Sequence, residues 1–293
     1  MKVRRRPVKT AVSVAANCPS CGHNSKGRFC SACGEDKGRS KDYSLLGHLG
    51  ETFKVITSIE SGFLRSFAAL ITKPGLLTSE YFAGRRKPFL KPLQLFLFCN
   101  IAFFLVQSFT GFNTLITPLS VHMSQLPYSN YARQKVNRTV IERGTTLNEY
   151  RVRFDATIAT QAKTLVFLMI PMFALLLQML YWRAGRYFVE HLVFATHFYS
   201  FFLLLLSADL LLTSAAVSLA RRLINNSAIS ESDSLLTLIL LALSLTYLLF
   251  AVRRAYKQSW LVTALKGVVL IAGVMFIVQL YRFCLFFTAS YWV

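Results

Sequence analysis

Acidic residues are scarce in this chain of 293 residues, which holds 13 Asp and Glu against 33 Lys and Arg. All charged residues together make up 16% of the chain, well below the roughly 25% of an average soluble domain. A soluble protein of this length would need a more polar surface. The sequence also lacks an internal repeat, a glycine-rich phosphate loop, a GxSxG motif and a Walker motif. It therefore gives no support for the nucleotide-binding and hydrolase classes that these motifs mark.

Hydrophobic residues make up 54% of the chain and are gathered in blocks. Apolar runs of about 18 or more residues with few charges are candidates for transmembrane helices. We predict five spans, at residues 93–113, 164–182, 192–212, 235–252 and 266–287. The expected fold class is an all-α integral membrane protein. Its helical bundle would occupy residues 92–293, and helices extending from the first two spans would enter an outside loop at 117–163.

The net charge of +20 is spread unevenly along the chain. Residues 1–92 alone hold 17 of the 33 Lys and Arg. If the N-terminus is cytoplasmic, the inside segments carry 23 cations and the outside segments carry 9, seven of them in loop 117–163. The positive-inside rule then places the N-terminus in the cytoplasm and the C-terminus outside. We therefore interpret the surplus positive charge as a signal that orients the protein in the membrane and attracts anionic lipids. Nucleic acid is a less suitable partner, because the basic loop 117–163 would lie outside the cytoplasm.

Residues 1–16 begin with a basic stretch that imitates a signal peptide. Their apolar part, residues 11–16, is interrupted by Ser13 and is shorter than the roughly 7–15 residues of a signal-peptide core. We therefore interpret this segment as a flexible basic tail.

Four of the six cysteines form two CxxC pairs separated by eight residues: Cys18, Cys21, Cys30 and Cys33. A CxxC turn directs two thiolates to one point, and Gly22 and Gly34, which follow the pairs, allow the positive φ that such turns use. Two such turns complete a tetrahedral Cys₄ shell, the closed geometry of a structural Zn²⁺ site. Residues 17–38 are therefore predicted to form a small zinc ribbon whose folding energy comes from its metal.

Disulfides and free thiols are the other interpretations of these four cysteines. Disulfides need an oxidising compartment, whereas the charge distribution places this segment in the cytoplasm, so zinc is preferred. A catalytic zinc is not favoured because cysteines fill all four positions, and a redox site is not favoured because no βαβ unit surrounds either pair. Cys99 and Cys284 lie in apolar spans and are interpreted as packing residues.

Residues 42–91 connect the ribbon to the first span. Within residues 42–72, apolar residues recur at spacings of three and four, which predicts an amphipathic helix interrupted at Ser61–Gly62. This helix would lie either in the membrane interface or packed against the other spans. Pro74-Gly75 then predicts a turn, and Leu76–Phe82 predicts a short helix that ends near the next glycine.

A dense basic cluster, which we call the basic hinge, stands directly before the first span and consists of Arg85, Arg86, Lys87 and Lys91. Pro92 follows at the expected first turn of the span helix. The basic hinge is either an anchor that orients this span or a site for lipid head groups.

Two stretches of the chain, KPGLLTSEYFAGRRKPFLKPLQLFLF and EHLVFATHFYSF, carry a family resemblance. Together with the N-terminal Cys₄ pattern, they resemble the bacterial multi-pass membrane family called domain of unknown function 3667. The first pattern of that family falls on Pro74, Tyr81, Gly84, Arg86 and Pro92. The second falls on Glu190, His191 and His197. The resemblance implies an integral protein of the bacterial inner membrane, and it implies no reaction.

Polar residues within the spans are costly and are therefore candidates for function. They are Asn100, Gln178, Glu190, His191, His197, Asp209 and Arg282. From a rise of about 1.5 Å per residue, Asp209 and Arg282 share a depth near the outer face. They are expected either to pair or to reach the outer interface separately. Glu190 and His197 share a helical face and suit a proton relay, a metal site or, as we prefer, hydrogen bonds between helices.

The combined features favour a non-enzymatic adaptor, assembly or regulatory protein that docks through a cytosolic zinc ribbon. A transporter or channel subunit for small solutes or ions is one alternative, because polar residues occur within the spans. A membrane-embedded enzyme that uses Glu190, His191 and His197 is the other. The expected partners are anionic lipids and a protein bound through the ribbon, and a homo-oligomer is left open.

Overall fold

The computed structural model describes residues 17–18, 20–24, 29–35, 62–111, 115–223 and 230–293, without the side chains of 219–238. The predicted tail 1–16 and the first part of the predicted amphipathic helix, residues 42–61, lie outside the described residues. Within the described residues the ordered secondary structure is helical and no β-strand occurs.

Five helical stretches are long and apolar enough to cross a membrane: Pro92–Thr110, Leu147–Leu180, Phe188–Ser218, Ile239–Tyr256 and Trp260–Trp292. Each contains most or all of one predicted span. Three of the observed stretches are longer than the predicted spans, because their helices continue beyond the predicted bounds at one end or at both. The protein is therefore an all-α membrane protein, which confirms the predicted fold class.

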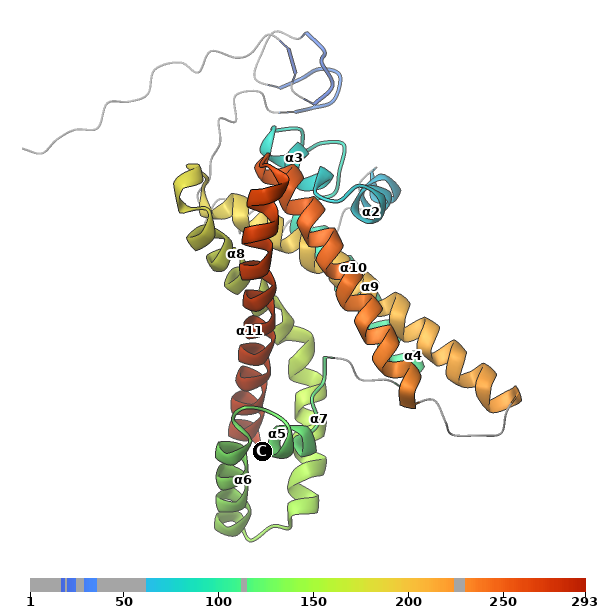
Figure 1. Cartoon of the computed structure of the whole chain (residues 1–293), viewed down its shortest axis with the longest axis vertical. Helices are drawn as coiled ribbons and strands as arrows, with labels where there is room; N and C mark the ends of the chain where they lie inside the picture. The colour runs from blue at the N-terminus through green and yellow to red at the C-terminus, as the bar shows by residue number, and fades with distance from the viewer. Residues whose placement is uncertain (1–16, 19, 25–28, 36–61, 112–114, 224–229) are drawn as a thin grey trace, which may run out of the picture.

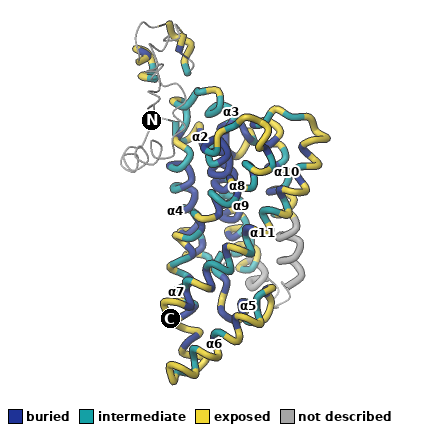
Figure 2. Tube along the Cα trace, turned by 90° about the vertical axis from the view of Figure 1, so that its left-hand side faces the viewer, coloured by how far each residue is buried: buried dark blue, intermediate teal, exposed yellow. Residues whose placement is uncertain are grey.

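Helix α9 (Phe188–Leu223) forms the centre of the bundle. It packs most extensively against α4 (Pro92–Thr110), and then against α8 (Met169–Leu180) and α10 (Ser230–Tyr256). The largest fully buried side chains at these contacts are aromatic: Phe96, Phe103, Phe173, Phe194 and Tyr199. Buried residues accordingly run along α8 and α9 in Figure 2. From Val189 to Leu210 most residues of α9 are buried, whereas Leu211 and Leu212 are exposed. A helix that crosses a membrane needs no polar face on either part.

The last helix, α11 (Trp260–Trp292), packs against α7 (Leu147–Leu165), α8 and α10. Helices α7 and α8 are joined by the 3₁₀ turn Val166–Leu168. Pro171 follows this turn, and its ring would clash with the carbonyl group four residues earlier in a regular helix. The tighter turn accommodates the proline and keeps the two helices in one continuous stretch.

Short helices stand at the two ends of the bundle, as Figure 1 shows. Helices α2 (Phe63–Thr72) and α3 (Leu76–Phe82) lie at one end, which we call the α3 end. Helices α5 (Leu119–Ser124) and α6 (Ser129–Arg143) lie at the other, which we call the α6 end. The predicted helix over Leu76–Phe82 is confirmed.

The segment predicted as the outside loop, residues 117–163, is mostly helical and has its own small core at the α6 end. Helices α5, α6 and α7 pack around the last turns of α11, where the buried residues include Val136, Phe154, Ile158 and Phe286. The backbone N–H of Leu119 donates a hydrogen bond to Oδ1 of Asp155 at 2.8 Å, which ties the start of α5 to α7. Helix α7 therefore extends the second span well beyond its apolar part, whereas α4 ends at Gly111.

Candidate metal centre and buried polar cluster

The two CxxC turns have the same backbone hydrogen bonds. The N–H of Cys18 donates to the carbonyl of His23 at 3.0 Å, and the N–H of Cys30 donates to the carbonyl of Glu35 at 2.7 Å. In each turn the glycine N–H also donates back to the carbonyl of the first cysteine. Gly22 and Gly34 have φ values of 74° and 71°, a left-handed conformation that glycine adopts without steric cost. The sequence therefore builds the same turn twice, as its two glycines predict.

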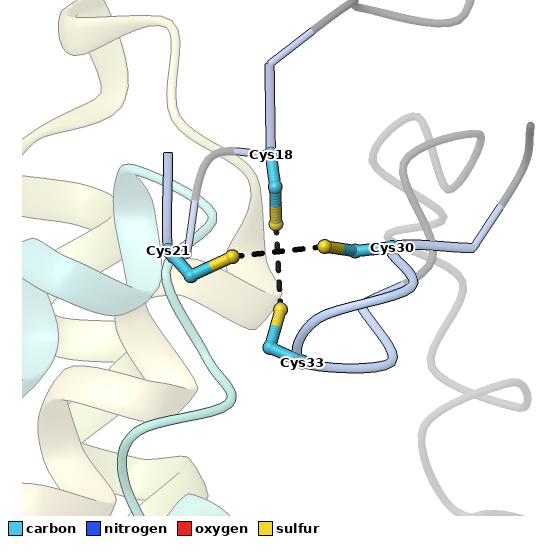
Figure 3. Close-up of side chains that lie close together, drawn as sticks. All are labelled: Cys18, Cys21, Cys30 and Cys33. Atoms are coloured by element: carbon cyan, nitrogen blue, oxygen red, sulfur yellow. Dashed lines mark hydrogen bonds between the residues drawn. The ribbon is translucent and has the colours of Figure 1, made fainter. Parts of the chain in front are cut away.

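The four cysteine sulfurs point to a common centre, as Figure 3 shows. The Sγ atoms of Cys18 and Cys33 are 3.5 Å apart, and those of Cys21 and Cys30 are 3.6 Å apart. All four Sγ atoms lie within 4.8 Å of one another. A tetrahedral shell with metal–sulfur bonds of about 2.3 Å has sulfur–sulfur edges of about 3.8 Å. The group therefore has the arrangement that can hold one metal ion, and none of its four sulfurs is bonded to another.

The turn between α2 and α3 is pressed against the backbone of α10. Gly75 has a φ of 73°, and a Cβ atom at this position would stand 2.5 Å from the carbonyl oxygen of Ala251. Only glycine fits this approach. The turn predicted from Pro74-Gly75 therefore also fixes the distance between α3 and the end of α10.

The basic hinge has contacts within its own segment. The Arg85 guanidinium forms a bidentate ion pair with Glu80, and this contact lowers the pKa of the Glu80 carboxyl group below its ordinary value. The guanidinium of Arg86 lies over the Tyr81 ring, 4.3 Å from its centroid. These contacts hold the hinge against α3. Lys87 is exposed, and Lys91 precedes α4, in which Pro92 stands in the first turn as predicted.

His197, one of the predicted polar residues, joins α9 to α3. Its Nδ1 and the Oγ1 of Thr78 share a buried hydrogen bond of 2.9 Å. Nearby, the N–H of Leu90 donates to Oγ of Ser66 at 2.8 Å, which ties the chain before α4 to α2. The sequence analysis did not identify Thr78 or Ser66, because short polar residues in a mixed segment carry no distinguishing pattern.

His191 belongs to a stack of aromatic rings at the α3 end. Its Nδ1 and the Tyr256 hydroxyl share a hydrogen bond of 2.6 Å, and the two rings are parallel within 13°. Tyr256 in turn stacks on Tyr181, with centroids 4.0 Å apart. Nζ of Lys266 lies 3.7 Å from the centroid of the Tyr181 ring, and Nε2 of Gln258 donates to the Tyr181 hydroxyl at 2.9 Å. This stack connects the ends of α8 and α10 with the starts of α9 and α11.

Glu190 is connected to this stack through Arg186, whose guanidinium lies 5.5 Å from the centroid of the Tyr256 ring. Its carboxylate accepts hydrogen bonds from Arg186 at 3.3 Å and from the Tyr187 N–H at 3.1 Å. Arg186 also donates to the carbonyl of Ala255 at 3.3 Å and lies 4.3 Å over the Phe82 ring. Arg186 therefore links α3, α9 and the end of α10.

Glu190, His191 and His197 thus have three different hydrogen-bonding partners, and two of these partners, Arg186 and Tyr256, are in contact with each other. His191 and His197 form hydrogen bonds between helices, to α10 and to α3, whereas Glu190 bonds to residues directly before its own helix α9. Asn100 is buried in α4, while Gln178 is half-buried in α8.

Arg282 lies near the α6 end, close enough to His122 to act on its charge. The ring of His122 is fully buried between Phe154 and Phe286, and its Nδ1 shares a 2.9 Å hydrogen bond with the Tyr128 hydroxyl. The predicted pairing of Arg282 with Asp209 stays a prediction. Sequence reasoning missed His122, because a lone histidine in an amphipathic loop has no identifying pattern.

Comparison with known proteins gives one match. Residues 60–104 match the model of a family described as "Protein of unknown function (DUF3667)". No curated protein and no solved structure matches the chain. The matched range covers α2, α3, the basic hinge and most of α4, while Glu190, His191 and His197 lie outside it. The resemblance to domain of unknown function 3667 is therefore confirmed over residues 60–104.

Proposed function

We propose that this protein is a non-enzymatic adaptor or assembly protein of the bacterial inner membrane, with a zinc-bound docking module on the cytoplasmic side. The observation that carries the proposal is the convergence of four cysteine sulfurs within 4.8 Å. A shell completed by four thiolates leaves no position for a substrate, so the metal would hold a fold rather than perform chemistry. The module would then present a small, rigid surface to which another protein can bind.

The orientation is part of the proposal and is supported by charge. The α3 end carries the basic hinge together with Arg183, Arg186, Arg253 and Arg254. Cations concentrate on the cytoplasmic side of membrane proteins. The cysteine module would then lie in a reducing compartment, where thiols stay free to bind zinc.

Zinc analysis of the purified full chain tests the metal. We expect one equivalent of zinc per chain, because four thiolates complete a single tetrahedral shell. The variant Cys18→Ser/Cys21→Ser should lose it. The variant Cys99→Ala/Cys284→Ala removes the same number of thiols from the bundle and should retain the zinc. Equal zinc content in both variants would overturn the assignment.

Cross-linking in cells, followed by identification of the captured proteins, tests the docking role. We expect a set of partners that the wild type and Cys99→Ala/Cys284→Ala share and that Cys18→Ser/Cys21→Ser loses. If the ribbon variant has lost its zinc but keeps all partners, the ribbon does not dock and the adaptor role is wrong. Solute flux through reconstituted protein would favour the transporter alternative instead.

A further inference from the structure

A cationic surface cavity lies at the α3 end, between the α2–α3 turn and the end of α10. Its volume is about 540 Å³, and its lining includes Lys73, Phe250, Arg253, Arg254, Lys257 and Gln258. Four of these residues are cations, and among the described residues that line the cavity none is acidic. All four cations are exposed to solvent.

We propose that this cavity binds the phosphate group of an anionic phospholipid. Clustered guanidinium and ammonium groups are the donors that proteins use for phosphate, since arginine can offer two parallel hydrogen bonds and lysine a compact charge. Such clusters next to the end of a membrane helix are typical of sites for anionic lipids.

Two segments far apart in the sequence are brought together to build this cavity. Lys73 precedes the α2–α3 turn, whereas Arg253 and Arg254 stand in the last turn of α10. The close approach of Gly75 to Ala251 sets the distance between these segments. Cations that served only to orient α10 in the membrane would not need Lys73 from a distant segment beside them.

Arg253 is held by a contact that leaves its charge uncompensated. The Arg253 guanidinium lies 4.4 Å over the Trp260 ring, and Trp260 packs edge-on against Phe250 at 5.1 Å. Glu80 is close enough to feel the charge of Arg254, but its carboxylate already forms the bidentate pair with Arg85. The charge of the cavity therefore remains positive and is available to an anion.

The position of the cavity favours a lipid over a free phosphate ion. The membrane-crossing stretch of α10 ends at Tyr256, directly between Arg254 and Lys257. Trp260 follows, and tryptophan concentrates where hydrocarbon meets head groups. Leu261 and Leu265, which follow Trp260 on the first turns of α11, are 86% and 75% exposed and provide an apolar surface for acyl chains.

The basic hinge, the other candidate for head groups, is used differently. Arg85 is engaged by Glu80, and Arg86 lies over Tyr81. The cavity can be tested separately, because substitutions inside and outside it can remove equal charge from the same end of the bundle.

Binding of a fluorescent anionic phospholipid to the purified full chain in zwitterionic nanodiscs tests the proposal. Lys73→Gln/Arg254→Gln should weaken binding by roughly tenfold or more, since each removed cation contributes to attraction of the anionic lipid. The matched control Lys87→Gln/Arg183→Gln should bind within about twofold of the wild type, and Lys73→Arg/Arg254→Lys should also retain binding. Equal losses in the cavity and control variants would overturn the proposal, because non-specific attraction would then explain binding.

Two further measurements use the wild-type protein, so they stay informative if a variant fails to fold. A phospholipid with a photoreactive acyl chain should label peptides from the α2–α3 turn, the end of α10 or the start of α11; labelling elsewhere alone would overturn the site. Millimolar glycerol phosphate should not displace the lipid. If glycerol phosphate displaces it, the cavity is a site for small phosphate esters and the assignment to lipid is wrong.

Discussion

Thr78 and His197 are 119 positions apart in the chain, and their side chains share a buried hydrogen bond of 2.9 Å. This contact fastens α3, within the family-matched segment, to the central helix α9. The matched segment is therefore joined to the bundle by a polar contact as well as by apolar packing.

Replacement of Thr78 by valine should destabilise the protein, because a buried nitrogen of His197 then loses its partner. We expect a loss of about 1 kcal/mol, the scale of such bonds within membrane bundles. The change is measured as a lower melting temperature in detergent. Thr78→Ser keeps the hydroxyl group and should stay closer to the wild type; a valine variant as stable as the serine variant would contradict the role of this bond.

Replacement of Gly75 by alanine should separate α3 from α10. The added Cβ would stand 2.5 Å from a backbone oxygen, and the residue would also keep a φ of 73°. We expect a loss of about 2–4 kcal/mol of stability. Gly84 is a matched control, because its φ is 84° but no atom lies within 4 Å of an added Cβ. Gly84→Ala should cost only about 1–2 kcal/mol for the left-handed backbone, and equal melting temperatures would refute the steric argument.

The stability of the α6 end should depend on pH through His122. Burial between aromatic rings, followed by the nearby Arg282, lowers the pKa of His122 to about 4 from 6.5. Between these values the unfolded chain binds a proton that the folded chain does not, so stability falls as the pH drops from 6.5 towards 4. The full effect is on the order of 3 kcal/mol.

Melting temperatures of the wild type and His122→Asn between pH 7 and pH 4 provide the measurement. Asparagine does not titrate, so the difference between the two proteins should shrink as the pH falls. The effects of carboxyl groups that titrate near pH 4 are the same in both proteins and therefore cancel in this difference. Parallel curves for the two proteins would show that His122 carries no such dependence.

Removal of the metal should unfold the cysteine module without changing the bundle. The described hydrogen bonds of Cys18, Ser20 and Cys30 all end within the module. The module is too short to bury a core, so the metal that we propose would supply its folding energy. After chelation, limited proteolysis should cut within residues 17–35, while the melting temperature of the bundle stays the same. A lower melting temperature would indicate that the module also supports the helices.

The five spans were predictable because each consists of an apolar run that no other environment accommodates. The helix Leu76–Phe82 was predictable because glycine marks both of its ends. The two CxxC turns were predictable from spacing alone. In each case the information lies within a short window of the sequence.

The contacts that hold the α3 end together could not be predicted in the same way. The contacts of Thr78, Tyr181 and Tyr256 form only when helices distant in the sequence pack together. The residues near them in the sequence do not indicate which side chains they will contact. The helical α6 end was missed as a core for a related reason. Its buried residues, such as Val136 and Phe154, alternate with charged ones and do not form an apolar run.

Helix α11 has a mechanical consequence. Its 33 residues extend over about 50 Å, whereas the hydrocarbon core of a bilayer is about 30 Å thick. Lys266 near one end lies on the Tyr181 ring, and Phe286 near the other lies in the core around α5 and α6. For a straight helix of this length, a tilt of roughly 5° moves one end by about 4 Å relative to the other. A load applied to the α6 end would therefore reach the aromatic stack at the opposite end directly, without passing through a flexible joint.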